Sequence, residues 1–167
     1  VGAELKQKAL IALILGVVAI FFYTTWRFET SFALGAIVAL IHDVFISLGV
    51  FVLLGREMSL PMVGAILAVA GYSINDTIVI FDRIRETFRG GLHGNRENAM
   101  NMAINQTLSR TLLTSGTTFL AVLVLFLFGG RVINDFALIL LIGIIVGTYS
   151  SIFIASPIAL LAGGRKK

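Results

Sequence analysis

Five long runs of apolar residues, separated by short polar segments, make up most of this chain. We place them near residues 8–26, 31–54, 61–82, 105–128 and 136–162. Because a helix needs about 20 residues to cross the hydrocarbon core of a bilayer, each run is long enough for one span. The sequence therefore predicts an all-α, polytopic membrane helix bundle with five transmembrane helices in a single transmembrane domain.

The polar segments predict how these helices connect. Residues 26–30, 55–61 and 129–135 are short, so we expect the helices that they join to be antiparallel neighbours. The longer loop 83–104 holds most of the polar residues of the chain. We expect it to be helical at both ends, with a break at Gly90-Gly91, because glycine commonly ends a helix.

Two features of the same loop support helical ends. Asp82 and Arg85, and likewise Glu86 and Arg89, have the i,i+3 spacing of helical ion pairs. Asn95 is a residue type that caps helix N-termini, so a second helix is expected to begin there and to run into the fourth span.

Composition narrows the class of protein. Hydrophobic residues are 57% of the chain and charged residues only 13%, against about 25% in soluble domains. The chain has no cysteine, which excludes disulfides and thiolate metal sites. No basic stripe lies on a soluble face, so a nucleic-acid partner is not predicted.

The basic residues predict an orientation, because Lys and Arg collect in cytoplasmic loops. With residue 1 outside, nine of the 13 basic residues fall on the cytoplasmic side: Arg27, Arg83, Arg85, Arg89, Arg96, Arg110, Arg165, Lys166 and Lys167. The C-terminus is then cytoplasmic. The first span follows Val1 closely, without the features of a signal peptide, so we expect the chain to be a fragment that lacks its natural start.

Small residues recur at helical spacing inside the spans, and such stripes let membrane helices approach closely. They include Gly35, Ala39 and Ser47 around Asp43, then Gly64, Ala68 and Gly71, and finally Gly143, Gly147, Ser151 and Ala155. We expect close helix packing at these positions, which would also bring polar side chains together.

Ionisable residues within the spans are the candidates for function, since each is costly at membrane depth. Asp76 lies six residues before the end of the third span, and Arg110 lies about as far inside the fourth. At 1.5 Å per residue both are roughly 9 Å from the cytoplasmic boundary, so the two side chains could pair. The pair is either a static ion pair or part of a proton path in which Asp76 binds and releases protons.

Three polar neighbours of Asp76, which are Ser73, Asn75 and Thr77, could hold water or relay a hydrogen bond. His42 and Asp43 form a possible secondary polar site, with Asp43 roughly 9 Å further from the cytoplasmic boundary than Asp76. This second site is either another station for protons or a set of hydrogen bonds to backbone or water at a helix crossing.

Enzyme chemistry is not predicted. In an intramembrane aspartyl protease two carboxylates share a proton, but the estimated depths of Asp43 and Asp76 differ, and residues 71–76 lack a Gly-x-Gly-Asp motif. A metal site based on His42 would need further ligands, and the second histidine, His93, is in the long loop. We therefore predict no catalytic residues, no metal and no cofactor.

Several segments resemble a known family in order along the whole chain. They are Gly71 to Glu86 (GYSINDTIVIFDRIRE), Asn105 to Thr111, Thr114 to Thr118, Ala39 to Val44 and Val1 to Leu5. Together they resemble the SecF family of the SecD/SecF protein-export complex, within the resistance-nodulation-division superfamily. The resemblance implies that a first helix and an external domain precede Val1 and that the chain is one half of a pseudo-symmetric bundle.

The resemblance also implies a function. It implies that the chain lies in the bacterial cytoplasmic membrane and uses the proton motive force to assist Sec-dependent export. Its partners would be SecD, the SecYEG channel, the translocating unfolded polypeptide and the lipid bilayer. The proton path of the family falls on Asp76 and Arg110. Whether protons or sodium ions are coupled stays open, as do two alternatives: half of an exporter of small molecules or lipids, and a subunit that only stabilises SecD.

Overall fold

The computed structural model describes residues 2–57, 59–91 and 95–163. Val1, His93 and the basic residues 165–167, which were singled out above, lie outside the described residues. Within the described ranges every regular element is helical, and five helices are long and apolar enough to cross a membrane. The predicted all-α, multi-span fold is confirmed.

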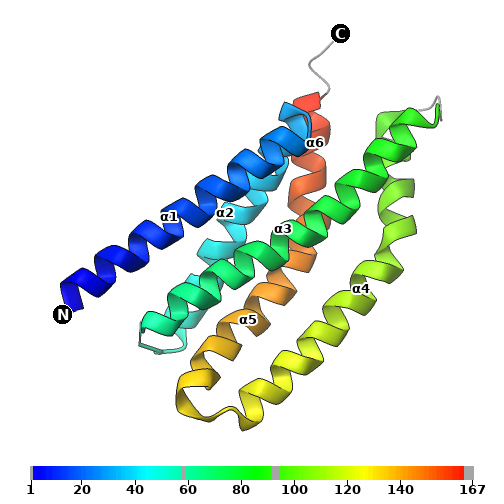
Figure 1. The fold of residues 1–167 in the computed structure, drawn as a ribbon. Helices are drawn as coiled ribbons and strands as arrows, with labels where there is room; N and C mark the ends of the chain where they lie inside the picture. The colour runs from blue at the N-terminus through cyan, green and yellow to red at the C-terminus, as the bar shows by residue number, and fades with distance from the viewer. Residues whose placement is uncertain (1, 58, 92–94, 164–167) are drawn as a thin grey trace.

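The elements follow the predicted order. They are α1 (Gly2–Arg27), α2 (Thr30–Leu53), α3 (Leu60–Arg89), α4 (Arg96–Phe128), α5 (Gly130–Ser150), a π-helical segment η1 (Ser151–Ala155) and α6 (Ser156–Gly163). The last three together form the fifth span. Consecutive spans run antiparallel, so the α1–α2 turn, the α3–α4 connection and the end of α6 lie at one end of the bundle (Figure 1). We call it the C-terminal end, and the opposite end the N-terminal end.

Helices α3 and α5 lie at the centre of the packing. Helix α3 packs against α1, α2, α4 and α5, and α5 packs against α2, α3 and α4. Small residues permit the closest approaches: a Cβ atom on Gly35 would collide with the carbonyl oxygen of Ala155, and one on Gly143 with the Val69 side chain. These contacts confirm the predicted role in helix packing for the small residues of α2 and of the fifth span. The prediction is wrong for Gly64, Ala68 and Gly71 of α3, which are exposed.

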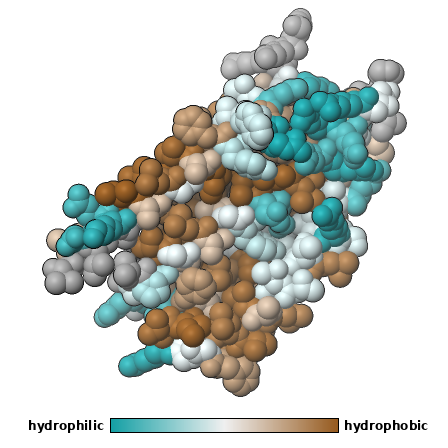
Figure 2. Space-filling view, viewed as in Figure 1, coloured by the Kyte–Doolittle hydropathy of each residue, from teal (hydrophilic) through white to brown (hydrophobic). Residues whose placement is uncertain are grey.

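Two apolar clusters stabilise the ends of the bundle. Near the C-terminal end, the Phe81 ring lies 5.9 Å from the Phe28 ring and 5.0 Å from the Phe32 ring. Near the N-terminal end, Phe51 and Val69 belong to a second buried cluster. Apolar side chains also dominate the outer surface along much of the bundle, and hydrophilic ones gather at the C-terminal end (Figure 2). This is the surface expected of helices that face lipid.

The turn between α4 and α5 is shorter than predicted. The sequence placed a loop at 129–135, but α4 ends at Phe128 and α5 begins at Gly130. Gly130 has a positive φ of 73°, a conformation that glycine adopts without steric cost and that allows a sharp reversal. The amide of Asn134 donates to the carbonyl oxygen of Phe126 at 2.8 Å, so polar residues assigned to a loop form the first turn of α5.

The α3–α4 connection follows the prediction. Helix α3 continues past its apolar run to Arg89, and the capping N–H of Gly90 donates to the carbonyl oxygen of Glu86. Gly91 has a positive φ of 70°. The side chain of Asn95 accepts from the N–H of Glu97 at 3.3 Å and caps α4. The predicted helical ends, and the break between them, are confirmed.

The ion pairs of this region differ from the prediction. Asp82 accepts two hydrogen bonds from Arg27 of α1, at 3.0 and 3.1 Å, and does not pair with Arg85. Glu86 pairs with Arg83 at 2.6 Å rather than with the arginine three residues after it. The spacing along α3 could not predict the partner of Asp82, because that partner is on another helix. Packing brings the end of α1 beside α3, so that Arg27 makes two hydrogen bonds to the Asp82 carboxylate.

The fifth span is not the continuous α-helix that the run 136–162 suggested. Its hydrogen bonding widens to π-helical geometry at Ser151–Ala155. Pro157 follows, and proline lacks a backbone N–H and clashes with the preceding turn of an α-helix. The hydroxyl of Ser156 donates to the carbonyl oxygen of Ser151 at 3.0 Å. The widened turn therefore lies beside the polar residues of the span, and such turns are frequent at functional sites.

Candidate functional site: two buried aspartates around α5

Asp76 on α3 lies in a cage of hydroxyl groups. Its side chain is buried and accepts hydrogen bonds from Ser115 of α4 at 3.1 Å and from Thr148 of α5 at 3.3 Å. The Thr148 hydroxyl also lies 2.8 Å from the Ser115 hydroxyl. One carboxylate therefore connects three spans.

The predicted ion pair between Asp76 and Arg110 is wrong in this structure. Among the described residues, no cationic side chain lies within the ion-pair distance of Asp76. Ser115 is five residues beyond Arg110, which places it roughly 7.5 Å further along α4 and about 140° around the helix. The estimate from span boundaries misjudged the register of α3 and α4 by about this amount.

Arg110 instead lines a cavity at the C-terminal end of the bundle. The cavity has a volume of about 500 Å³ and is also lined by Thr107, Asp82 and Val79. A buried stripe of hydroxyls at i,i+4 spacing leads from it along α4: Thr107, Thr111 and Ser115. The Thr111 hydroxyl is buried and has no hydrogen-bond partner among the described residues. The stripe runs along α4 from the cavity to the cage of Asp76, without hydrogen bonds between its hydroxyls among the described residues.

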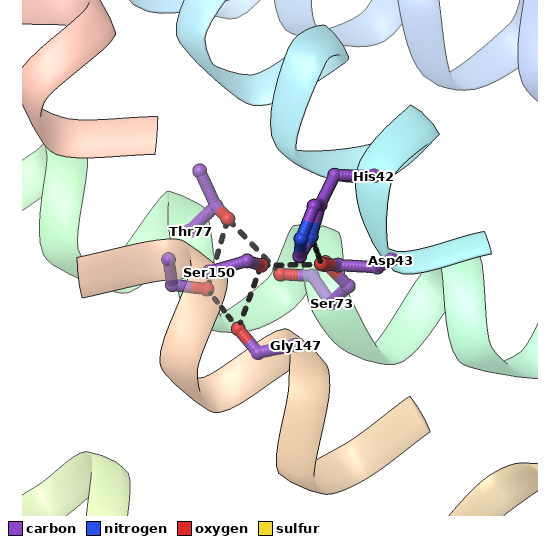
Figure 3. A network of polar contacts seen from close by, with 7 residues as sticks. His42, Asp43, Ser73, Thr77, Gly147 and Ser150 are labelled. Atoms are coloured by element: carbon purple, nitrogen blue, oxygen red, sulfur yellow. Dashed lines mark hydrogen bonds and ion pairs between the residues drawn. The ribbon is translucent and has the colours of Figure 1, made fainter. Parts of the chain in front are cut away.

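Asp43 on α2 is fully buried and forms a second polar centre (Figure 3). Its carboxylate accepts from Ser73 of α3 and, at 2.6 Å, from Ser150 of α5. The other carboxylate oxygen lies 2.9 Å from Nδ1 of the half-buried His42. The arrangement agrees with the interpretation as hydrogen bonding at a helix crossing, although the partners are side-chain hydroxyls rather than backbone or water.

The polar neighbours assigned to Asp76 have other positions. Ser73 contacts Asp43, and the Thr77 hydroxyl lies 3.1 Å from that of Ser151 while donating to the carbonyl oxygen of Ser73. Asn75 is exposed on the outer surface of α3. Neighbours in sequence on a helix point in different directions, so adjacency to Asp76 did not predict contact with it.

The two aspartates lie at similar depth, which corrects the estimate of roughly 9 Å between them. Their partners on α5, Thr148 and Ser150, are two residues apart, so they are roughly 3 Å apart along the axis and about 200° apart around it. The two carboxylates therefore contact nearly opposite faces of α5, and no described residue bridges them by hydrogen bonds. The pair does not share a proton as protease carboxylates do.

Comparison with known proteins places the chain in a family. The family model described as "Protein export membrane protein SecD/SecF, C-terminal" matches residues 1–165. The chain belongs to the SecD/SecF family. It is similar to the protein translocase subunit SecF of Desulfurispirillum indicum, with 54% identity over 93% of this chain and 51% of the relative. It is also similar to the SecF subunit of Vibrio alginolyticus, with 51% identity over 100% of this chain and 53% of the relative.

Solved structures of SecDF share the fold. A crystal structure of SecDF from Thermus thermophilus, described as a translocon-associated membrane protein, matches with a TM-score of 0.94 and 45% identity over 99% of this chain. A structure of SecDF in its Super-membrane-facing form matches with a TM-score of 0.91 and 44% identity over 99% of this chain. The chain covers 23% of each SecDF chain and about half the length of the SecF relatives. The resemblance predicted from the motifs is confirmed.

Sequence reasoning missed the α4 and α5 partners of the two aspartates in this SecD/SecF chain. Thr148, Ser150 and Ser115 were not singled out as site residues, although they hold both carboxylates. A signal was available. Apart from Ser156, the segment 148–151 (TYSS) holds all the polar residues of the otherwise apolar run 136–162. A polar group in the middle of a span needs a partner, so this segment pointed to the aspartates on other helices.

Proposed function

We propose that this chain is the membrane part of a SecF-type subunit that pairs with SecD and uses the proton motive force to assist Sec-dependent protein export. The observation that carries the proposal is the environment of Asp76, a buried carboxylate within a span whose partners among the described residues are hydroxyls. The names of its relatives support the direction of transport, because they are subunits of a protein translocase.

A cage of hydroxyls suits a group that binds and releases protons. The Ser115 and Thr148 hydroxyls donate to the ionised carboxylate, and after rotation they accept from the protonated one. A fixed ion pair would favour the ionised form alone. We therefore assign Asp76 as the proton carrier of the chain, with no bound cofactor and no enzymatic reaction.

The cavity and the hydroxyl stripe supply a route for the proton. A proton released by Asp76 would follow Ser115, Thr111 and Thr107 to the cavity lined by Arg110, with water molecules between hydroxyls that are one helical turn apart. Arg110 would act at the mouth of this route, and a shift of α4 along α3 would bring it closer to the carboxylate. Motion of the helices and proton occupancy would then be coupled, as a transport cycle requires.

Asp43 and His42 have a different role in this proposal. The Asp43 carboxylate ties α2 to α3 and to α5, next to the π-helical segment. We assign it as the tie that holds α2 against the centre of the bundle while α4 moves. Export through SecYEG would use movements transmitted from this bundle to the translocating polypeptide.

Precursor export by energised inner-membrane vesicles that hold the intact complex tests the function. An ionophore that dissipates the proton gradient should remove the stimulation that the complex adds to export, because the step that drives it loses its energy source. Vesicles without the complex are the control for effects of the ionophore on the channel itself. Stimulation that survives the ionophore would contradict a proton-driven role.

We further propose that the C-terminal end of the bundle faces the cytoplasm, because most basic residues lie there. The chain has no cysteine, so single cysteines report orientation cleanly. Arg89 is exposed at the end of α3. In sealed cells, the thiol of Arg89→Cys should not react with a membrane-impermeant reagent until the membrane is permeabilised. Arg131→Cys, at the other end, should react at once. The reverse pattern would overturn the orientation.

A further inference from the structure

The cavity at the C-terminal end carries an excess of positive charge. Five arginines line it, from the end of α1, the last turns of α3 and the interior of α4: Arg27, Arg83, Arg85, Arg89 and Arg110. Two carboxylates, Asp82 and Glu86, line it as well. The difference is three positive charges in a space of about 500 Å³.

The two carboxylates neutralise two of the arginines. Asp82 pairs with Arg27 at 3.0 Å, and Glu86 pairs with Arg83 at 2.6 Å. In the described ranges, no carboxylate lies within 4.0 Å of the three remaining arginines. One of them, Arg85, has its Nη1 atom 3.5 Å from the backbone carbonyl oxygen of Arg27, so its side chain reaches from α3 to the end of α1. Cations gathered in this way repel one another unless an anion joins them.

The position of the cavity relative to the membrane indicates which class of anion it binds. Trp26, beside Arg27, is 85% exposed, and exposed tryptophans of membrane proteins lie at the level of the lipid headgroups. On α4, Leu112 and Leu113 follow Arg110 toward the membrane centre and are 55% and 67% exposed. The cationic cavity therefore lies at headgroup level, with apolar surface beside it for acyl chains.

We propose that this cavity binds the phosphate of an anionic phospholipid. Guanidinium groups bind phosphate oxygens in a two-bond geometry, and basic pockets between membrane helices on the cytoplasmic side accept such headgroups. Arg85 and Arg89 hold the phosphate, and the acyl chains lie along the exposed leucines of α4. The bound lipid joins the ends of α1 and α3 to the part of α4 around Arg110. Lipid binding at this site is independent of the role of Asp76.

Native mass spectrometry of the intact protein, purified with the subunits that accompany it, tests the site by titration with dioleoyl phosphatidylglycerol. Arg85→Gln with Arg89→Gln should weaken binding of this lipid roughly thirtyfold. Each basic residue near the membrane surface contributes a similar free energy to binding an anionic lipid, so each arginine accounts for about half of this loss in free energy. Arg85→Lys with Arg89→Lys keeps the charge and should retain most of the binding. Dioleoyl phosphatidylcholine should bind less tightly than phosphatidylglycerol to the wild type.

A matched control removes two positive charges elsewhere. Lys8→Gln with Arg131→Gln, at the N-terminal end, should leave phosphatidylglycerol binding unchanged. Inorganic phosphate at millimolar concentration should not displace the lipid, and displacement would indicate a site for free phosphate instead. If the Arg85→Gln, Arg89→Gln variant bound phosphatidylglycerol as tightly as the wild type, the proposal would be overturned. So would protection of Arg85 and Arg89 from an arginine reagent in the delipidated complex, because a partner subunit would then cover the cavity.

Discussion

Replacing Asp76 with asparagine should leave the bundle assembled and remove the proton-dependent stimulation of protein export. Asparagine nearly preserves the shape of the side chain, so Ser115 and Thr148 keep a partner, but the titrating group is lost. The membrane potential supplies about 2.3 kcal/mol per proton per 100 mV, which biases a two-state step by about fiftyfold. Export by energised vesicles, at equal expression, should fall to the level seen with an ionophore.

The control for this prediction removes a carboxylate at the N-terminal end of the bundle. Asp135 pairs with Arg56 at 2.9 Å, away from the two buried aspartates. Asp135→Asn should therefore keep the stimulation, although it loses the same charge. Complex formation with SecD is checked for both variants by co-purification. Full stimulation by Asp76→Asn would end the carrier assignment and leave Asp76 as a hydrogen-bonded tie between helices.

Replacing Gly35 with alanine should destabilise the bundle by about 1–3 kcal/mol, the usual cost of overpacking a filled core. The added Cβ would collide with the carbonyl oxygen of Ala155 and approach the backbone nitrogen of Ala159 to 3.2 Å. Both atoms belong to backbone, in η1 and α6, so no side-chain rotation relieves the contact. The thermal midpoint of the protein solubilised in mild detergent should fall, and α2 should separate from the π-helical segment.

Gly49 provides the matched comparison on the same helix. A Cβ atom added there meets nothing within 4 Å, so Gly49→Ala should keep or raise the free energy of unfolding, by up to about 1 kcal/mol, as alanine does in a helix interior. Equal destabilisation by both substitutions would show that the contact with Ala155 does not determine the effect, because alanine at an uncrowded helical position favours folding. An unchanged midpoint for Gly35→Ala would contradict the close approach itself.

The amino-acid sequence alone determined the class of the protein, its spans and its family. Apolar runs are recognisable because the bilayer sets the length of a span, and Gly90 and Asn95 mark helix ends because their chemistry acts on neighbouring backbone. Asp76 and Asp43 also stood out, because an ionisable residue within an apolar run is costly wherever the helix lies. Each of these inferences uses information that is local along the chain.

Only the tertiary structure decided which groups meet. Arg110 seemed level with Asp76 when depth was counted from span boundaries, but the register and rotation of α4 bring Ser115 to the carboxylate instead. The same holds for Ser150, which reaches Asp43 because close packing aligns α5 with α2. Contacts between helices depend on sliding by a few ångströms and turning by tens of degrees, and these quantities are set by side-chain packing over the whole bundle rather than by spacing on any one helix.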